Sequence, residues 1–359
     1  MDQNAVRAAF EKVKAEVDAG RLPGVAVVIL YRGETILNEQ YGWAMLTPER
    51  VPLPPAAIFD LASVTKVVAT TPAVMRLMEQ GKVALDAPVA DYLPEFEAAG
   101  KAAVTVRHLL THTSGLPWWK PFYRSCSTRE AVWQAVCDTP LESEPGSQCV
   151  YSDLEFLTLG VLVERLSGLR LDEFCRREFF GPQGLIDTDY CPPPEKWARC
   201  AATEQCPWRG RVMRGEVHDE NAYACGGVAG HAGLFGPAPE LARWFGSLLA
   251  AHPVCGPAFQ TGPPLLQTDT VATMLARQPG PAWDSFALGW RWLDYRNGEV
   301  AASPQAFGHS GFTGTLLWAD PCRDLAVVFL SNRVHPSRDN PCLNEVRPAF
   351  LRSVIRAAG

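Results

Sequence analysis

The sequence of 359 residues has no apolar run that approaches the ~18 residues needed to cross a membrane as a helix. Residues 1–20 also lack the unbroken apolar segment and the small-residue cleavage site of a secretory signal peptide. Val6, Phe10, Val13 and Val17 instead recur at helical spacing between charged residues. These absences predict a protein without a signal peptide or a membrane span, whose chain opens on an amphipathic helix.

Basic blocks and paired cysteines are missing as well. The formal net charge is −6 with no cluster of Lys and Arg, which argues against a nucleic-acid partner. The 11 cysteines are an odd number and none forms a CxxC pair, so they indicate neither a disulfide framework nor a zinc site. Unpaired thiols are typical of the reducing cytoplasm, and we expect the protein to be cytoplasmic.

Strand-like segments lie near both ends of the sequence. Residues 24–44 have the pattern of two strands joined by a turn at Arg32-Gly33. Strands near the C-terminus are predicted within residues 286–295, 305–320 and 324–332, with turns at 296–299 and 320–324 and a closing helix over 343–358. Both ends of the chain therefore contribute strands to the predicted sheet.

The middle of the sequence has a different pattern. From about residue 82 to residue 244, helical segments alternate with long loops. This order predicts an α/β fold of the α+β type, with an antiparallel sheet drawn from both termini, flanked by helices and interrupted by a helical insertion. We place the sheet domain at residues 1–66 and 285–359, and the mainly helical domain at residues 67–284.

One apolar helix, predicted within residues 59–82, carries two polar residues that need an explanation. Ser63 lies near its start, and Lys66 follows one turn later among small apolar side chains. Residues three apart share a helix face, so Lys66 can reach the Ser63 hydroxyl. The predicted N-cap, kink and C′ residues of this helix are Asp60, Pro72 and Gly81.

The S-x-x-K pair has a chemical interpretation. A serine hydroxyl is a poor nucleophile until a base takes its proton, and a buried lysine can serve as that base. The helix N-terminus adds positive potential near a developing oxyanion. The structural alternative is an ordinary helix serine beside a lysine whose ammonium reaches solvent. Because S-x-x-K arises often by chance, later motifs must decide between these interpretations.

Two later motifs support the chemical interpretation. Tyr151-Ser152-Asp153 lies at a predicted loop–helix junction, where the Tyr151 phenol could share the role of general base. In the third motif, residues 308–312, a glycine lets substrate backbone approach a strand edge. The amides of Ser63 and Phe312 could form an oxyanion hole. Read alone, these motifs equally describe a core tyrosine beside a helix cap and a buried histidine in a strand.

Taken in order, SVTK, YSD and HSG resemble the serine β-lactamase and penicillin-recognising family. The similarity is greatest to its class C-like branch, which includes esterases and D-alanyl-D-alanine carboxypeptidases. The stretches LTHTSGLP, GKVALDAPVADYLPEF and GGVAGHAGLF match as well, so the resemblance spans nearly the whole chain from about Gly24. It implies a β-lactamase/transpeptidase-like fold, with no metal and no cofactor.

The resemblance also implies roles for particular residues. Ser63 would be acylated, Lys66 and Tyr151 would shuttle protons, and water would release the acyl group. The binding residues that it implies are Asp153, His231, His309, Ser310, Gly311 and Phe312.

The sequence departs from the family pattern at two positions. Asp153 stands where the second motif usually ends in Asn, and a carboxylate only accepts hydrogen bonds. Asp153 could hold Lys66 as an ion pair and move the base role toward Tyr151. His309 stands where the third motif commonly opens with Lys, and histidine is mostly neutral at pH 7. This change predicts weaker selection for carboxylate-bearing β-lactams and more tolerance of neutral esters or amides.

Other polar or aromatic clusters have weaker interpretations. His108 and His112 have metal-ligand spacing, but Leu109 replaces the Glu of zinc proteases, which favours structural histidines. His218-Asp219 with His231 fits no standard metal set. Trp118 and Trp119 could line an acyl pocket, although we favour a role in covering the core. Arg333 and Arg338, in residues 332–338, could offer cations to a substrate at the rim of the cleft. The G-x-S-x-G elbow of α/β-hydrolases is absent.

The sequence thus predicts a serine hydrolase that works through an acyl-enzyme on Ser63, with a small-molecule ester or amide as substrate. β-Lactamase or D-alanyl-D-alanine carboxypeptidase activity is the first alternative. A ligand-binding or sensor module on the same fold, acylated without turnover, is the second. The intact SVTK and YSD motifs argue against such an inactive site.

Overall fold

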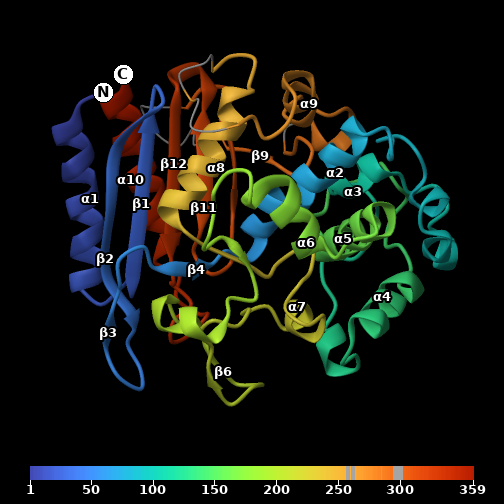
Figure 1. Cartoon of the computed structure of the whole chain (residues 1–359), viewed down its shortest axis with the longest axis horizontal. Helices are drawn as coiled ribbons and strands as arrows, with labels where there is room; N and C mark the ends of the chain where they lie inside the picture. Colours follow the sequence, from blue (N-terminus) through green and yellow to red (C-terminus); the bar gives the residue numbers. More distant parts are fainter. Residues whose placement is uncertain (256–258, 260–262, 284, 294–301) are drawn as a thin grey trace.

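A seven-stranded antiparallel sheet forms one half of the molecule (Figure 1). The computed structural model describes residues 1–255, 259, 263–283, 285–293 and 302–359. The strands span Gly24–Tyr31 (β1), Glu34–Met45 (β2), Val51–Pro52 (β3), Arg291–Trp292 (β9), Phe307–Ser310 (β10), Leu316–Asp320 (β11) and Leu325–Ser331 (β12). Their order is β3-β2-β1-β12-β11-β10-β9, so strands from the two ends of the chain meet where β1 pairs with β12.

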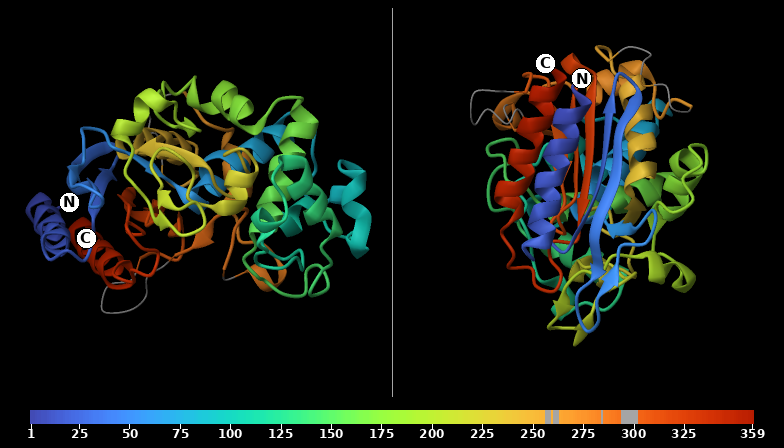
Figure 2. Two further views of the ribbon diagram at one scale, coloured as in Figure 1. Left: turned by 90° about the horizontal axis from the view of Figure 1, so that it is seen from below. Right: turned by 90° about the vertical axis from the view of Figure 1, so that its left-hand side faces the viewer.

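Helices cover both faces of this sheet (Figure 2, right). They span Gln3–Asp18 (α1), Ala238–Ala250 (α8) and Leu343–Ala358 (α10). Val25, Val27 and Ile29 of β1 share a core with α1 and α10, whereas the intervening residues of β1 share the larger core with α8. Successive side chains of a strand point to opposite faces, so an apolar run such as β1 suits a strand that is buried on both sides.

The other half of the molecule is mainly helical (Figure 1). Its α-helices are Thr71–Glu79 (α2), Val106–Leu110 (α3), Arg129–Asp138 (α4), Asp153–Ser167 (α5), Leu171–Cys175 (α6), Glu220–Ala224 (α7) and Thr268–Met274 (α9). Two small sheets accompany them, formed by Ile58–Asp60 (β4), Leu234–Pro237 (β8) and Asp189–Tyr190 (β5), and by Gln205–Cys206 (β6) and Arg211–Val212 (β7). Short 3₁₀ or π-helical turns span Ala62–Val64, Lys66–Thr70, Val89–Asp91, Pro94–Gly100, Phe122–Arg124, Arg176–Phe180, Pro194–Arg199, Gly280–Ala282 and Pro321–Arg323.

The sequence predicted the framework of the large sheet. β1 and β2 are joined at Arg32-Gly33, where both residues have positive φ, 52° and 78°. The turn predicted at 320–324 separates β11 from β12, and the closing helix is α10. The expected α/β fold, with an antiparallel sheet from both termini, is confirmed.

Some strand predictions were wrong. The single strand expected within residues 305–320 is the hairpin β10–β11, because the Gly311 amide donates to the Thr315 carbonyl (2.8 Å) and closes a turn. Within residues 286–293 only β9 forms. The turn predicted at 296–299 and the end of that strand lie outside the described residues. The small sheets around β8 were not predicted, since their strands have only two to four residues.

The proposed division into residues 1–66 plus 285–359 and residues 67–284 stays a prediction. In this structure α8, from the second range, packs on β1 and β12. Within the part of the chain that the structure describes, no helix has both the length and the apolar character that a membrane span requires.

Candidate active site

The Ser63 segment connects the small sheet to the helical half. After β4 the chain makes a 3₁₀ turn at Ala62–Val64, followed by a π-helical turn at Lys66–Thr70 and then α2. The predicted N-cap at Asp60 is wrong, because Leu61 is the N-cap residue of the first turn; Asp60 Oδ1 still accepts from the Ala62 amide (2.8 Å). Pro72 lies in the first turn of α2, directly after the π-helical turn and not in the helix interior, so the kink predicted at Pro72 stays a prediction. The turn that contains Ser63 has a strained backbone at Ala62, whose φ is 46°.

Lys66 is completely buried and uses all three of its N–H groups. Nζ donates to Ser63 Oγ at 3.1 Å, to Asp153 Oδ1 at 2.7 Å and to the His231 carbonyl at 3.2 Å. These contacts, one of them with a carboxylate, suit an ammonium group. Burial lowers the pKa of Lys66, but Asp153, and after it Tyr151, more than offset this, so the pKa lies above its usual value. Lys66 is therefore a charged partner of Asp153 in the resting protein.

Tyr151 lies beside this pair at the start of α5. Its neighbour Ser152 caps the helix, accepting from the Leu154 amide (3.2 Å), so the predicted loop–helix junction is confirmed. Lys66 Nζ is 4.8 Å from the centroid of the Tyr151 ring. Burial raises the pKa of Tyr151 more than the charge on Lys66 lowers it. The phenol is therefore neutral and close to both atoms of the S-x-x-K pair.

The third motif forms the opposite side of the site, on β10. The ring of His309 is buried, and its Nδ1 donates to the Ser310 carbonyl (3.0 Å). In the neutral ring Nε2 is then an acceptor, and Nε2 has no hydrogen-bond partner among the described residues. Burial and the charge of Lys66 hold the pKa of His309 well below its usual value. His309 is thus a neutral residue in place of a cation. The expected oxyanion hole of the Ser63 and Phe312 amides stays a prediction.

Gly311 explains how the third motif is held against the Ser63 turn. A Cβ on this residue would lie 2.3 Å from the carbonyl oxygen of Leu61 and 2.2 Å from Thr315 Oγ1. Thr313 and Thr315 donate to the carbonyls of Asp60 (2.7 Å) and Leu61 (2.9 Å). Only glycine permits this approach, which fixes β10 and the Ser63 turn relative to one another.

A glycine-rich loop, residues 226–233, carries His231. Gly230 lies so close to α5 that a Cβ would be 2.0 Å from the Phe156 carbonyl oxygen. Thr70 Oγ1 donates to the Gly230 carbonyl (2.6 Å), and the buried His231 ring contacts Asp219 Oδ1 through Nε2 (2.9 Å). The loop is therefore anchored on three sides, and its contact with the S-x-x-K pair is the backbone carbonyl of His231.

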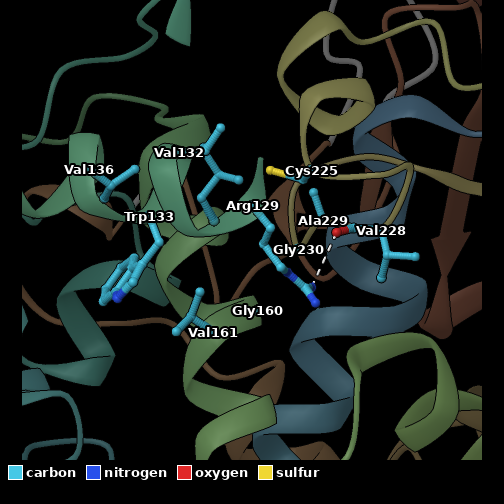
Figure 3. A pocket seen from close by; sticks show the side chains of 11 residues that line it. Arg129, Val132, Trp133, Val136, Gly160, Val161, Cys225, Val228, Ala229 and Gly230 are labelled. Atoms are coloured by element: carbon cyan, nitrogen blue, oxygen red, sulfur yellow. Dashed lines mark hydrogen bonds between the residues drawn. The ribbon is translucent and has the colours of Figure 1, made fainter. Parts of the chain in front are cut away.

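Behind this loop lies a smaller cavity between α4 and α5, which Figure 3 shows. Arg129 reaches across it and donates to the Val228 carbonyl (3.3 Å), and it also forms an ion pair with Glu164 (2.6 Å). Trp133 and Val161 supply an apolar wall. The Arg129 guanidinium is thus already paired with Glu164. The side chains around this cavity pack against the loop, and none of the predicted site residues lines the cavity.

The predicted residues converge on one pocket of about 490 Å³. Eight of the nine candidate residues line it: Ser63, Tyr151, Asp153, His231, His309, Ser310, Gly311 and Phe312. The ninth, Lys66, lies beneath the floor with its ammonium against Ser63. The order of motifs in the sequence therefore identified the residues of a common site.

The remaining pocket walls were predicted less well. Trp118 lines the pocket and is 63% exposed, so the core-covering role that we favoured is wrong for this residue. His218, Asp219 and Glu220 also line the pocket; from the sequence we considered His218 and Asp219 only within a poor metal motif and did not consider Glu220. Arg338 reaches the rim as expected.

Charged neighbours engage several of these wall residues. Arg338 donates to Glu204 (2.8 Å) and Glu220 (2.6 Å). His218 contacts Glu204 Oε2 through Nε2 (3.0 Å). Arg333 donates to the carbonyls of Arg338 (2.9 Å) and Asn340 (2.7 Å). This network ties the C-terminal rim to the segment before α7.

The two histidines with metal-ligand spacing have structural surroundings. His112 Nδ1 contacts Glu155, which also accepts from Ser114 Oγ (2.6 Å). Burial lowers the pKa of His112 well below its usual value and raises that of Glu155 well above it, so the pair is uncharged. His108 Nδ1 instead accepts from the Thr105 amide (3.2 Å) in a helix cap.

One set of side chains in the described ranges could hold a metal ion, because ligand atoms of Asp153, Asp219 and His231 lie within 4.8 Å of one another. Asp219 also caps α7 by accepting from the Ala222 amide (2.7 Å). The Lys66 ammonium, 2.7 Å from Asp153, already supplies a positive charge there. This geometry disfavours a second cation.

Comparisons with known proteins agree with this geometry. The family model described as Beta-lactamase matches residues 9–347. Proteins named "Putative D-alanyl-D-alanine carboxypeptidase" from Salmonella agona (strain SL483) and Salmonella schwarzengrund (strain CVM19633) are 31% and 32% identical, covering 96% of this chain and 86% of the relative.

Solved structures share the fold at lower identity. A penicillin-binding protein homologue from Caulobacter crescentus has a TM-score of 0.76 at 22% identity, covering 99% of this chain and 97% of its own. EstCE1, described as a hydrolase with promiscuous acyltransferase activity, has a TM-score of 0.77 at 23% identity, covering 99% of both chains. At this identity the likeness concerns the fold alone.

Proposed function

This chain belongs to the β-lactamase family of serine hydrolases, and from that membership we propose that Ser63 is its acylated nucleophile. One observation carries the proposal. Ser63 Oγ lies 3.1 Å from Nζ of a fully buried lysine, at the floor of a pocket that also contains the Tyr151 ring. A hydroxyl next to a buried titratable amine is the arrangement that nucleophilic catalysis requires.

The proton inventory of the site suggests the order of steps. Lys66 must first lose one proton to solvent, since an ammonium cannot accept another. The neutral amine then takes the Ser63 proton while Oγ bonds to the substrate carbonyl carbon. Tyr151, which lies beside both groups, gives its phenolic proton to the leaving oxygen or nitrogen as the bond from that atom to carbon breaks, and it takes the Ser63 proton from Lys66 in return. Water then attacks the acyl-enzyme by the reverse proton route and releases the acid.

The neutral third motif supports esters or small amides as substrates. His309 gives no positive charge at the position where a substrate carboxylate would need one. The pocket also presents exposed apolar surface from Trp118 and Phe312, 63% and 49% exposed, which suits an uncharged group. We therefore place esterase or amidase activity first.

β-Lactamase or D-alanyl-D-alanine carboxypeptidase activity is the second candidate. It is favoured by the relatives that carry the carboxypeptidase name at 31–32% identity. The rim arginine Arg338 could meet a carboxylate only in competition with Glu204 and Glu220. This competition is why we place the activity second.

Two measurements test the proposal. Hydrolysis of a p-nitrophenyl ester and of a cephalosporin is compared for the wild type and for Ser63→Ala. We expect faster ester turnover and its loss in Ser63→Ala; faster cephalosporin turnover would favour the second candidate. Intact mass after brief exposure to the ester then separates a hydrolase, which returns to its free mass, from an acylated sensor, which keeps the adduct.

We keep the cytoplasm as the proposed compartment. All 11 cysteines are unpaired, and most of them are buried. An oxidising compartment would expose accessible thiols such as Cys191 and Cys322 to oxidation. Cell fractionation with an antibody to the protein would test this assignment.

A further inference from the structure

Exposed aromatic side chains gather on one side of the active-site pocket. The described residues include nine exposed large apolar side chains. Four of them lie at the pocket or on rings connected to it: Trp118 (63% exposed), Phe312 (49%), Trp208 (47%) and Tyr223 (37%). Exposed apolar surface that is concentrated in this way, and not scattered, marks a place where something binds.

Three of these exposed rings and two neighbouring rings form a continuous series of five, which we name the aromatic strip: Trp118, Trp119, Tyr123, Trp208 and Tyr223. Successive ring centroids are 5.8, 6.5, 4.8 and 5.9 Å apart. The first two rings line the pocket that contains Ser63, and the others continue away from it. The strip is therefore an extension of the pocket and not a separate patch.

Surrounding hydrogen bonds hold the strip in place. The Tyr123 amide donates to Asn221 Oδ1 (3.0 Å) of α7. Arg209 lies over the rings of Trp208 and Tyr223, at 5.5 and 4.4 Å from their centroids. Its guanidinium donates to two backbone carbonyls, those of residues 217 and 218 (2.7 and 2.8 Å), which precede Asp219 in the pocket wall. Rings fixed in this way lose little entropy when a ligand binds.

We propose that the aromatic strip is a subsite for the distal aromatic part of an ester or amide substrate that has two or more rings. This inference rests on the proposed function, because the scissile bond of the same molecule must reach Ser63. Flat rings stack on tryptophan and tyrosine with a gain of about 0.5–1.5 kcal/mol per pair beyond the area that they bury. Continuity with the pocket, and not exposure alone, selects part of the substrate as the occupant.

The test compares one-ring and two-ring esters within each protein. Phenyl acetate and 4-biphenylyl acetate place the rings on the alcohol side, and methyl benzoate and methyl 4-phenylbenzoate place them on the acyl side. We expect the wild type to prefer the two-ring ester of at least one pair. Trp119→Ala and Tyr123→Ala, at the part of the strip nearest the pocket, should each lower that preference in kcat/KM by about 2- to 12-fold, the change that 0.5–1.5 kcal/mol produces.

A ratio measured within one protein does not depend on the fraction that folds, and the second variant guards against a local defect in the first. Trp283 is the matched control, since it is 53% exposed but belongs to neither pocket nor strip. Trp283→Ala should keep the wild-type ratio. An unchanged ratio in both strip variants would overturn the subsite. Failure of the proposed function looks different, because ester hydrolysis would then persist in Ser63→Ala.

Discussion

Replacing Asp153 by Asn tests how the protonation of Lys66 is controlled. In the resting site the Asp153 carboxylate keeps Lys66 charged, and a charged lysine cannot accept the Ser63 proton. The Asp153→Asn variant removes the negative charge but keeps an oxygen that can accept a hydrogen bond from Nζ. The pKa of Lys66 should fall, and a larger part of the protein should hold the neutral amine at pH 7.

The size of this effect follows from the geometry of the pair. Two unit charges about 4 Å apart attract by about 4 kcal/mol at an effective dielectric constant of about 20. Asp153 Oδ1 is closer, at 2.7 Å, but its side chain is 17% exposed and solvent screens part of the attraction. The asparagine oxygen retains about 1 kcal/mol as a hydrogen bond. A remainder of about 1.4–3 kcal/mol corresponds to about 10- to 160-fold more neutral amine below the pKa of Lys66.

The assay is kcat/KM for a p-nitrophenyl ester as a function of pH. Because activity requires the deprotonated amine and Asp153 raises the pKa of Lys66, the wild-type rate should climb into the alkaline range. In Asp153→Asn the rising limb should move to lower pH and the rate at pH 7 should increase. Asp86→Asn, which removes a surface carboxylate paired with Arg107 (2.6 Å), controls for the loss of a charge elsewhere.

One outcome would refute this account of the base. If kcat/KM of Asp153→Asn fell at every pH while the rising limb of its pH profile stayed at the wild-type position, the Asp153 carboxylate would be needed in the reaction itself. The Ser63→Ala variant, measured over the same range, supplies the uncatalysed background that grows with hydroxide concentration.

Three further predictions follow from other contacts. Because its pKa is low, His309 stays neutral as pH rises through the ordinary histidine pKa of about 6.5. The pH profile of kcat/KM between about pH 5.5 and 8 should therefore have the same shape in the wild type and in His309→Ala. A rising or falling limb of that profile that is lost in the variant would contradict this. In urea unfolding, Gly230→Ala should lower the free energy of unfolding by about 3 kcal/mol, because its Cβ would meet the Phe156 carbonyl. Gly81→Ala, strained at φ 68° but with open space around it, should lower it by about 1–2 kcal/mol. A loss for Gly230→Ala no larger than that for Gly81→Ala would show that the loop moves aside. Lys101→Met should lower the free energy of unfolding by about 2–3 kcal/mol, since it leaves buried carbonyls without a donor. The variant should keep its kcat/KM per folded molecule. A loss of this activity would mean that Lys101 acts on the site.

Lys101 also shows why a buried lysine alone does not identify an active site. Like Lys66 it is completely buried, but its Nζ donates to three backbone carbonyls, including those of Cys137 (2.5 Å) and Thr139 (2.9 Å). Burial lowers the pKa of Lys101, and no serine or carboxylate is among its hydrogen-bond partners. The sequence separated the two lysines because the interval of three residues places a serine on the same helix face as Lys66.

Parts of the site that depend on contacts distant in the sequence could not be predicted in this way. The third acceptor of Lys66 is a backbone carbonyl, that of His231, and any residue type would offer the same atom. The role of Asp219 as partner of the His231 ring depends on how α7 is placed beside residues 226–233. By contrast, Gly230 did carry a signal, because a glycine cluster indicates close backbone approach even when its partner, here Phe156, is unknown.

The two departures from the family pattern act in the same direction on the charge of the pocket. With Asn and Lys at positions 153 and 309 the two side chains would contribute +1, whereas Asp153 and the neutral His309 contribute −1. That difference of two charges lies within the lining of one pocket, where solvent screening is incomplete. A substrate carboxylate near the scissile bond would meet less attraction here, and an uncharged ester or amide would lose nothing. We therefore expect Asp153, which keeps Lys66 protonated at rest, to favour neutral substrates as well. Asp153→Asn should raise the rate for carboxylate-bearing β-lactams relative to neutral esters, and an unchanged ratio would separate the two effects.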